Sequence, residues 1–261
     1  MTTTIALAGK GGVGKTTIAG LIIKYLVHTQ TGAVLAIDAD PSSNLNMVLG
    51  LDLEWTVGDI RENILGEVKK SLVSSGAAMG TLPGGVTKRD YLDYQIRSSL
   101  AEGDRFDLIA MGRSEGPGCY CAVNHNLRDV IDSISNNYRY VVIDNEAGME
   151  HLSRRTTRDV EHLLIISDPT QRGIVAAERI ASFRNELDVN INNAYLIINR
   201  VPEDIPEALH NLSNLIDIPL LGFIREDSSI SSMDLSGQPI VNINEHSQTY
   251  KSISIILEKI L

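Results

Sequence analysis

The stretch Gly9-Lys10-Gly11-Gly12-Val13-Gly14-Lys15-Thr16 decides how the rest of the chain is interpreted. It matches the pattern G-x-x-x-x-G-K-[ST], and it lies between an apolar run ending at Ala8 and an aliphatic stretch that can form a helix. Such glycines let backbone N–H groups point at phosphate oxygens, and a helix N-terminus favours negative charge. We therefore expect a nucleoside phosphate site. Its residues are Gly11, Gly12, Val13, Gly14, Lys15, Thr16 and Thr17, with Lys15 reaching the β- and γ-phosphates and Thr16 ligating Mg²⁺.

Short apolar runs recur along the chain, and stretches with the apolar periodicity of a helix separate them. The runs are Thr4–Ala8, Ala33–Ile37, Phe106–Met111, Tyr140–Ile143, His162–Ile166 and Ala194–Ile198. Helices are expected after Lys15, near Leu127–Ile134 and over Ile174–Leu187. This alternation predicts a single α/β domain over residues 1–261, with a doubly wound, mostly parallel sheet and helices on both faces. The segment 66–94 departs from the pattern and is interpreted as a loop and helix inserted at the surface.

Composition and charge narrow the possible partners. The 261 residues include 23 basic and 33 acidic ones, a formal net charge of −10, which argues against binding of nucleic acid. No apolar run approaches the roughly 20 residues needed to span a bilayer, and the start of the chain lacks the pattern of a secretory signal. We expect a cytoplasmic protein. The apolar stripe of Ile253, Ile256, Leu257, Ile260 and Leu261 is expected to pack on the sheet rather than on a membrane, because it has little basic support.

A second lysine in the phosphate loop, Lys10, is not needed to hold one nucleotide. The loop from Gly9 to Thr17 resembles the deviant Walker A loop of the class that contains MinD, ArsA and nitrogenase iron protein. The resemblance implies an ATPase in which Lys10 reaches across a homodimer to the nucleotide of the other subunit. A cation inserted in this way would stabilise charge on the transferring phosphoryl group, so hydrolysis and dimerisation would be coupled.

Carboxylates follow two of the expected strands. Asp38 and Asp40 stand in Asp38-Ala39-Asp40-Pro41, which resembles switch I of that class. The resemblance implies that Asp40 orients the attacking water and that Asp38 supports Mg²⁺; the alternative is that these acids cap a strand end or the next helix. Asp144 ends an apolar run as in a Walker B motif and is expected to hold a Mg²⁺-bound water. Gly148 follows in a switch II-like position, where its N–H could sense the γ-phosphate.

Two further positions concern the base and the switch. Asn199 and Arg200 close the run at Ile198, and the resemblance places there an asparagine that pairs with adenine; a turn asparagine without a ligand is the alternative. Arg225 stands where the class usually has proline, which leaves its base contact open. Glu146 also departs from the usual switch II residue, and it could perturb the site or contact a partner protein.

Cys119 and Cys121 are the two cysteines of the chain. A disulfide between positions so close would be strained, and in a reducing compartment such thiols favour metal binding. A zinc-like site needs four ligands, so two copies of the pair would complete one site in a symmetric dimer. Plain buried thiols are the alternative. His125 could supplement the site, although lone histidines are usually solvated or satisfied by ordinary hydrogen bonds.

The run 111–121, together with 167–173, resembles the CooC-type accessory ATPases of carbon monoxide dehydrogenase. The resemblance implies ATP/ADP and Mg²⁺ as cofactors, Ni²⁺ or Zn²⁺ at a cysteine site between two subunits, and carbon monoxide dehydrogenase as the client into which nickel is inserted. Soft thiolates accept several such metals, so affinity alone does not select one. Two alternatives stay open: a membrane-switching spatial regulator like MinD, and an ATPase that carries an iron-sulfur cluster on the same cysteines.

Overall fold

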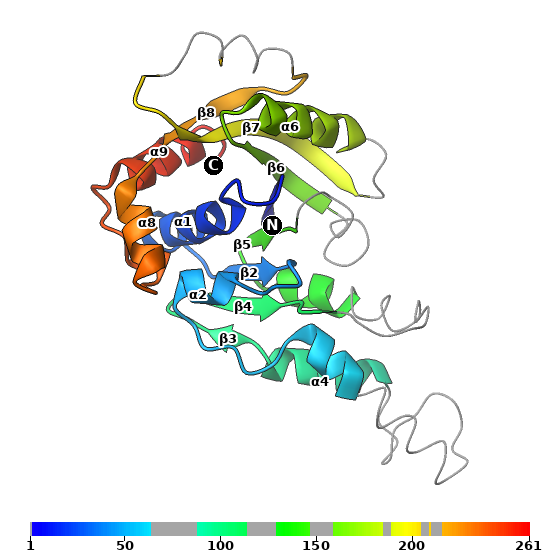
Figure 1. The fold of residues 1–261 in the computed structure, drawn as a ribbon. Helices are drawn as coiled ribbons and strands as arrows, with labels where there is room; N and C mark the ends of the chain where they lie inside the picture. The colour runs from blue at the N-terminus through cyan, green and yellow to red at the C-terminus, as the bar shows by residue number, and fades with distance from the viewer. Residues whose placement is uncertain are drawn as a thin grey trace, which may run out of the picture.

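The computed structural model describes residues 2–63, 88–113, 129–146, 159–184, 189–204, 209 and 216–261. Within these residues eight strands form one sheet (Figure 1). The strands are β1 Thr3–Gly9, β2 Val34–Asp38, β3 Ala101–Glu102, β4 Phe106–Ala110, β5 Tyr140–Asp144, β6 Asp159–Ser167, β7 Asn190–Val201 and β8 Leu220–Arg225. Their order across the sheet is β3-β4-β2-β5-β1-β6-β7-β8, and every pair is parallel except β3 with β4.

The predicted fold class is confirmed. All six apolar runs singled out in the sequence form strands. Two strands were not predicted. β3 has only two residues, and β8 includes Gly222, whose missing side chain interrupts the apolar pattern. Both lie at the edges of the sheet, where a short or irregular strand is tolerated because only one neighbour has to match its register.

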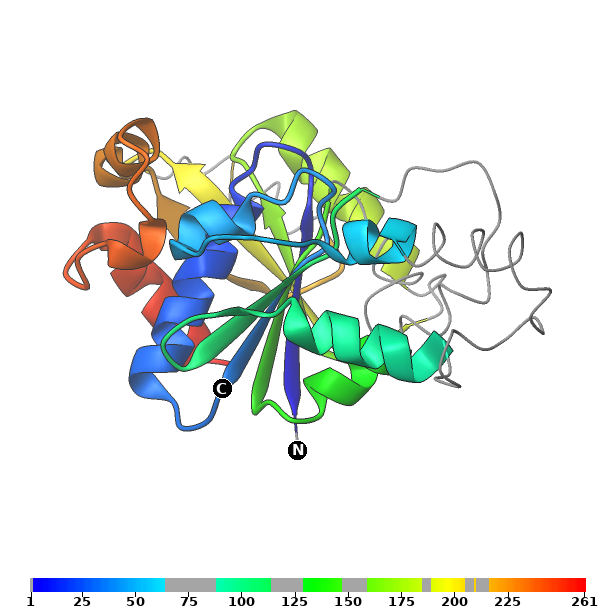
Figure 2. The same ribbon diagram turned by 90° about the horizontal axis from the view of Figure 1, so that it is seen from below.

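Helices cover both faces of the sheet (Figure 2). One layer contains α1 Lys15–Thr29, α2 Leu45–Leu49, α8 Ser228–Leu235, the 3₁₀ helix η3 Ile240–Asn242 and α9 Gln248–Leu257. The other contains α4 Lys88–Ser98, α6 Gln171–Phe183 and the helical residues 57–63 and 129–135. Helices joining parallel strands are expected on both faces, because each crossover must return over the sheet.

The central strand shows how the sequence divides the core into these two layers. Along β1, Ile5 and Leu7 are buried in the part of the core that contains the α1 side chains. Ala6 and Ala8 are buried in the part on the opposite face of the sheet. Side chains of a strand alternate between its faces, so a strand covered on both sides has to be apolar at every position. The continuous run Ile5–Ala8 is therefore the signature of a central strand.

Helix α9 places the C-terminal apolar stripe against the sheet. Ile253, Ile256 and Leu257 are buried with α1 and β8, as expected. Leu261 remains 42% exposed at the end of the chain. No helix in the described part of the chain has the length and apolarity needed to cross a bilayer.

The expected surface insertion at 66–94 overlaps helix α4, which begins at Lys88. Leu92 and Ile96 of this helix are almost completely buried in the core. The end of the segment therefore contributes to the domain core. Residues 66–87 lie outside the described residues, as do Cys119, Cys121, His125 and Gly148.

Candidate nucleotide-binding site

Asp38, Asp144 and the phosphate loop, which the sequence singled out, lie together where the parallel strands β1, β2 and β5 end. β2 and β5 run side by side in register, so that Asp38 lies opposite Asp144. Leu7 of β1 is the other neighbour of Asp144, and the phosphate loop follows β1 directly. In open α/β sheets ligands bind outside the carboxyl ends of the strands, and this end of the strands therefore is where the chain would hold one.

The phosphate loop ends at Gly14, whose backbone has a left-handed conformation that only glycine adopts easily. Gly14 has a φ of 93° and precedes the first residue of α1, and no side chain caps the helix there. The N–H groups of the first turn thus have no side-chain acceptor, which is the arrangement that an anion requires. A Cβ on Gly14 would lie 2.5 Å from Asn199 Nδ2, so the side chain of Asn199 packs closely against the loop at this point.

Asn199 holds the loop in place. Its Nδ2 donates a hydrogen bond to the carbonyl oxygen of Val13 at 2.8 Å, and the residue is only 8% exposed. The sequence predicted that Asn199 reads adenine. The structure gives its amide nitrogen a protein partner within the loop, and Asn199 is not among the residues that line the cavity described below.

Lys15 lies folded back over its own loop. Its Nζ donates to the carbonyl oxygens of Gly9 and Lys10, each at 3.3 Å, and the residue is 8% exposed. Burial lowers the pKa of the ammonium group, and the nearby carboxylates of Asp144 and Asp40 partly oppose this. A buried cation whose hydrogen bonds to the described residues are these two long ones has capacity left for an anionic ligand.

Asp38 and Asp144 are both buried but are satisfied differently. Asp38 accepts hydrogen bonds from the backbone N–H groups of Leu45, at 2.9 Å, and of Asp40, at 3.1 Å. Burial nevertheless raises the pKa of Asp38 to about 7, which these backbone N–H groups partly oppose. Leu45 is the first residue of α2, so the hydrogen bond from its N–H ties Asp38 to the start of that helix.

Asp144 is a buried carboxylate whose charge is not stabilised by hydrogen bonds of normal geometry from the described residues. Neither of its oxygens has a hydrogen-bond partner of normal geometry among the described residues, although the side chain is 1% exposed. Burial raises the pKa of Asp144 to about 6, and the Thr16 hydroxyl and Lys15 counteract this only in part. Buried charges are normally paired or coordinated to a metal. Asp144 and Thr16 therefore fit a site for a hard divalent cation.

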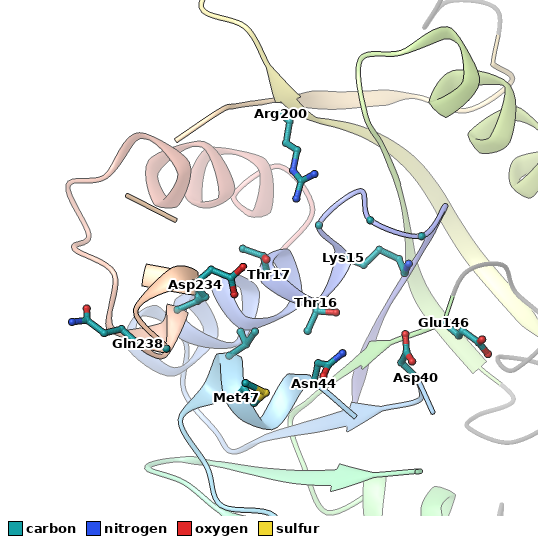
Figure 3. Close-up of a pocket in the computed structure, with 16 residues that line it drawn as sticks. Lys15, Thr16, Thr17, Asp40, Asn44, Met47, Glu146, Arg200, Asp234 and Gln238 are labelled. Atoms are coloured by element: carbon teal, nitrogen blue, oxygen red, sulfur yellow. The ribbon is translucent and has the colours of Figure 1, made fainter. Parts of the chain in front are cut away.

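Asp40 lies at the mouth of the site on an exposed turn. Its Oδ1 accepts hydrogen bonds from the backbone N–H of Ser42 at 2.8 Å and from its hydroxyl at 2.6 Å. The side chain lines the same cavity as Lys15 and Thr16 (Figure 3). Its position is compatible with the predicted contact to an attacking water.

A cavity of about 580 Å³ lies at the phosphate loop and is lined by Lys15, Thr16 and Asp40. Besides the phosphate loop and Asp40, it is lined by residues that the sequence did not single out: Asn44, Met47, Val48, Asp234, Gly237, Gln238 and Ile240. They come from α2 and the residue before it, from the end of α8, from the loop that follows α8 and from the start of η3 (Figure 3). Only the left-handed Gly237, two residues before Pro239, gave a turn signal that could have pointed to this wall.

Arg200 and Glu146 line the cavity as well. Arg200 projects into it from β7 and has a left-handed φ of 57°, a conformation that costs energy in a residue other than glycine. Arg200 was predicted to bind the nucleotide and lines the cavity, whereas Arg225 does not line it. Next to Glu146, Asn145 is buried and its Nδ2 donates to the carbonyl oxygen of Leu7 at 2.8 Å. This bond ties the end of β5 to β1.

The chain matches the model of the CobQ/CobB/MinD/ParA nucleotide binding domain over residues 4–240. It belongs to this family. The family implies a nucleotide with Mg²⁺, and the described residues fit both: the uncapped start of α1 and Lys15 suit phosphate, and Asp144 with Thr16 suits the cation. Such an ion would neutralise charge on the phosphates and orient them.

Relatives and solved structures agree with this assignment. The chain is 43% identical to an uncharacterized ATP-binding protein of Methanocaldococcus jannaschii, over 98% of both chains. It is 30% identical to the carbon monoxide dehydrogenase accessory protein CooC of Rhodospirillum rubrum, over 89% of this chain and 87% of that protein. The structure is similar to that of the septum site-determining protein MinD with Mg-ADP from Pyrococcus horikoshii, with a TM-score of 0.68, 22% identity and coverage of 99% and 96%.

Proposed function

We propose that the protein is an ATP-hydrolysing metallochaperone, which forms a nucleotide-linked homodimer and helps to insert nickel into the active-site cluster of carbon monoxide dehydrogenase. The position of Lys10 is the observation that supports a nucleotide-linked dimer. This residue belongs to the phosphate loop, yet it is exposed and does not line the cavity of its own chain. A loop lysine on the outer side is available to the nucleotide of a second copy.

Hydrolysis follows from the division of roles within the cavity. Lys15 and Thr16 line the cavity at the phosphate end, the buried Asp144 interacts with both, and Asp40 lines the cavity where a water can approach. When bound, Mg²⁺ supplies charge neutralisation on the phosphates. Lys10 of a second copy would add positive charge in the transition state, so turnover would require the dimer.

The metal and the client are proposed from Cys119 and Cys121 and from the CooC relative. Four thiolates from two chains would give a soft site for Ni²⁺ or Zn²⁺ that forms and opens with the nucleotide-driven dimer. CooC of Rhodospirillum rubrum is named as an accessory protein of carbon monoxide dehydrogenase, which supports that enzyme as the client. Nickel is here the cargo of the protein rather than its cofactor.

A regulator like MinD is the second candidate. Putative septum site-determining proteins named MinD are similar to this chain, for example that of Chlorella vulgaris at 27% identity over 91% of this chain and 76% of that protein. The buried face of α9 argues against α9 itself as a membrane-switching helix, since Ile253, Ile256 and Leu257 already pack in the core.

The test is an anaerobic titration with Ni²⁺ and with Zn²⁺ of the wild type, of Cys119→Ser/Cys121→Ser and of Lys10→Ala, with the mass in solution measured with ADP and with ATP. We expect one tightly bound metal per dimer, lost in the cysteine variant, and no ATP-dependent dimer for Lys10→Ala although it still binds ADP. A dimer that forms with ATP but ignores the metal would instead favour the regulator. Visible absorption of the purified protein would indicate an iron-sulfur carrier.

A further inference from the structure

Helix α6 has an outer face that core packing does not explain. Its inner face is buried against the sheet through Gly173, Ile174, Ala177 and Ala181. Beside it lies a second stripe at helical spacing, made of Arg172, Val175, Ala176, Arg179, Ile180 and Phe183; of these, Ile180 is half-buried and also packs against the core. Val175 is 39% and Phe183 54% exposed. A helix with a mixed apolar and basic outer stripe is suited to contact another surface.

All of the stripe except Phe183 lines one wall of a groove of about 570 Å³. The other wall is the outer side of the phosphate loop, at Lys10 and Gly11. Val175, Ala176 and Ile180 supply the apolar part of the lining, with Arg172 and Arg179 beside them. The residues of α6 that line the groove run from Gln171 to Ile180, ten residues or about 14 Å along the helix axis. That is the length of a short helix laid in a groove.

The charge of the groove is opposite to that of the protein. Lys10, Arg172 and Arg179 line it, no acid does, and none of the three forms an ion pair with any described residue. Glu178, the one acid of α6, is not part of the lining. In a chain of net charge −10 such a concentration of cations favours an anionic occupant, because local potential steers association more than net charge does.

The groove shares a wall with the nucleotide cavity. Gly11 lines both, from opposite sides of the phosphate loop. A ligand that contacts Gly11 and Lys10 in the groove therefore contacts the loop whose conformation the nucleotide sets. Binding at one side has to depend on binding at the other if the loop differs between nucleotide states, since coupling is reciprocal.

We propose that this groove docks an acidic helical segment of a partner protein, whose apolar residues lie on Val175 and Ile180 while its carboxylates meet Arg172 and Arg179. The mixture of cations with an apolar floor favours a protein segment over nucleic acid, which would contact the cations alone. The proposal is independent of the metal and of the identity of the client, and it adds a docking surface to the proposed function.

The test uses a fluorescein-labelled 20-residue peptide with leucines at positions i, i+3, i+4 and i+7 and glutamates on both flanks. Fluorescence anisotropy measures its binding to the wild type, Arg179→Glu, Val175→Asp and the control Lys251→Glu, each with ADP and with a non-hydrolysable ATP analogue. Lys251 is exposed on α9, away from the groove, and gives the same change of charge. ADP affinity and melting temperature verify that every variant is folded.

We expect saturable, salt-sensitive binding that Arg179→Glu and Val175→Asp each weaken about tenfold or more, while Lys251→Glu leaves it unchanged. The affinity should also differ between the two nucleotides. No saturable binding to the wild type, or equal loss in Lys251→Glu, would overturn the proposal. Two other results for Arg179→Glu would also overturn it. If the variant loses the ATP-dependent dimer but still binds the peptide, the face is a contact between copies. If it loses only the binding of a 20-base-pair DNA duplex, the groove binds nucleic acid.

Discussion

Asn199 Nδ2 donates a hydrogen bond to the backbone carbonyl oxygen of Val13, at 2.8 Å, from a residue that lies 186 positions further along the chain. This contact joins the end of β7 to the phosphate loop after β1, although β6 lies between the two strands in the sheet. The conformation of the loop is thus fixed by a part of the chain that no local motif includes.

Asn199→Ala should weaken nucleotide binding by roughly 10- to 100-fold, because the loop loses a buried hydrogen bond and Val13 keeps an unpaired carbonyl. Isothermal titration with ADP and GDP measures the loss. If Asn199 braces the loop, both nucleotides lose affinity equally. If it reads adenine, only ADP does. Asn192→Ala is the control, since Asn192 lies on the same strand but at the far end, hydrogen-bonded to Glu161.

Gly14→Ala should abolish nucleotide binding, because the new Cβ would lie 2.5 Å from Asn199 Nδ2 and the backbone is left-handed there. The double variant Gly14→Ala/Asn199→Ala removes the collision but keeps the backbone strain. We therefore expect it to bind better than Gly14→Ala and no better than Asn199→Ala. Titration of the four proteins of this cycle measures the coupling; simple additivity of the two losses would show that the side chains do not collide.

Asp144→Asn should stabilise the protein in the absence of nucleotide and Mg²⁺ while abolishing Mg²⁺-dependent nucleotide binding. Burial raises the pKa of Asp144 from 3.8 to about 6, so the folded state binds its proton more tightly than the unfolded state does. The associated stability is complete below pH 3.8 and is lost as the pH rises through about 6. The gain from asparagine should accordingly grow between pH 4 and 6 and then level off, at on the order of 2 to 3 kcal/mol.

Urea unfolding of both proteins in EDTA between pH 4 and 8 measures this gain. Asp52→Asn, which removes an exposed carboxylate, should show no comparable gain at any pH. A constant difference between wild type and Asp144→Asn over the whole range would mean that Asp144 is not the group that titrates.

Sequence reasoning was most successful where a local pattern has a single physical meaning. The continuous apolar run Ile5–Ala8, which is buried, predicted a central strand of the sheet, and the glycines of the phosphate loop predicted the phosphate end of the cavity. It failed at the far wall of the cavity, because Met47, Asp234 and Gln238 carry no motif. They meet only because α2 and η3 pack on α1 and α8 packs on η3. Asn199 shows the same limit, since its position was predicted but its partner depended on three-dimensional contact.

Asp40→Asn should leave ATP binding intact but reduce hydrolysis by about 100-fold or more, since a positioned carboxylate typically contributes that much to activating a water. Asparagine keeps an oxygen that can accept the hydrogen bond of the Ser42 N–H, so the turn should survive. Phosphate release and sedimentation with ATP measure the outcome, and the variant should accumulate as the ATP-bound dimer. Ser42→Ala is the matched control, because it removes the 2.6 Å hydroxyl contact and leaves the carboxylate in place. Hydrolysis lost equally in both variants would show that the turn, and not the carboxylate, is what the reaction needs.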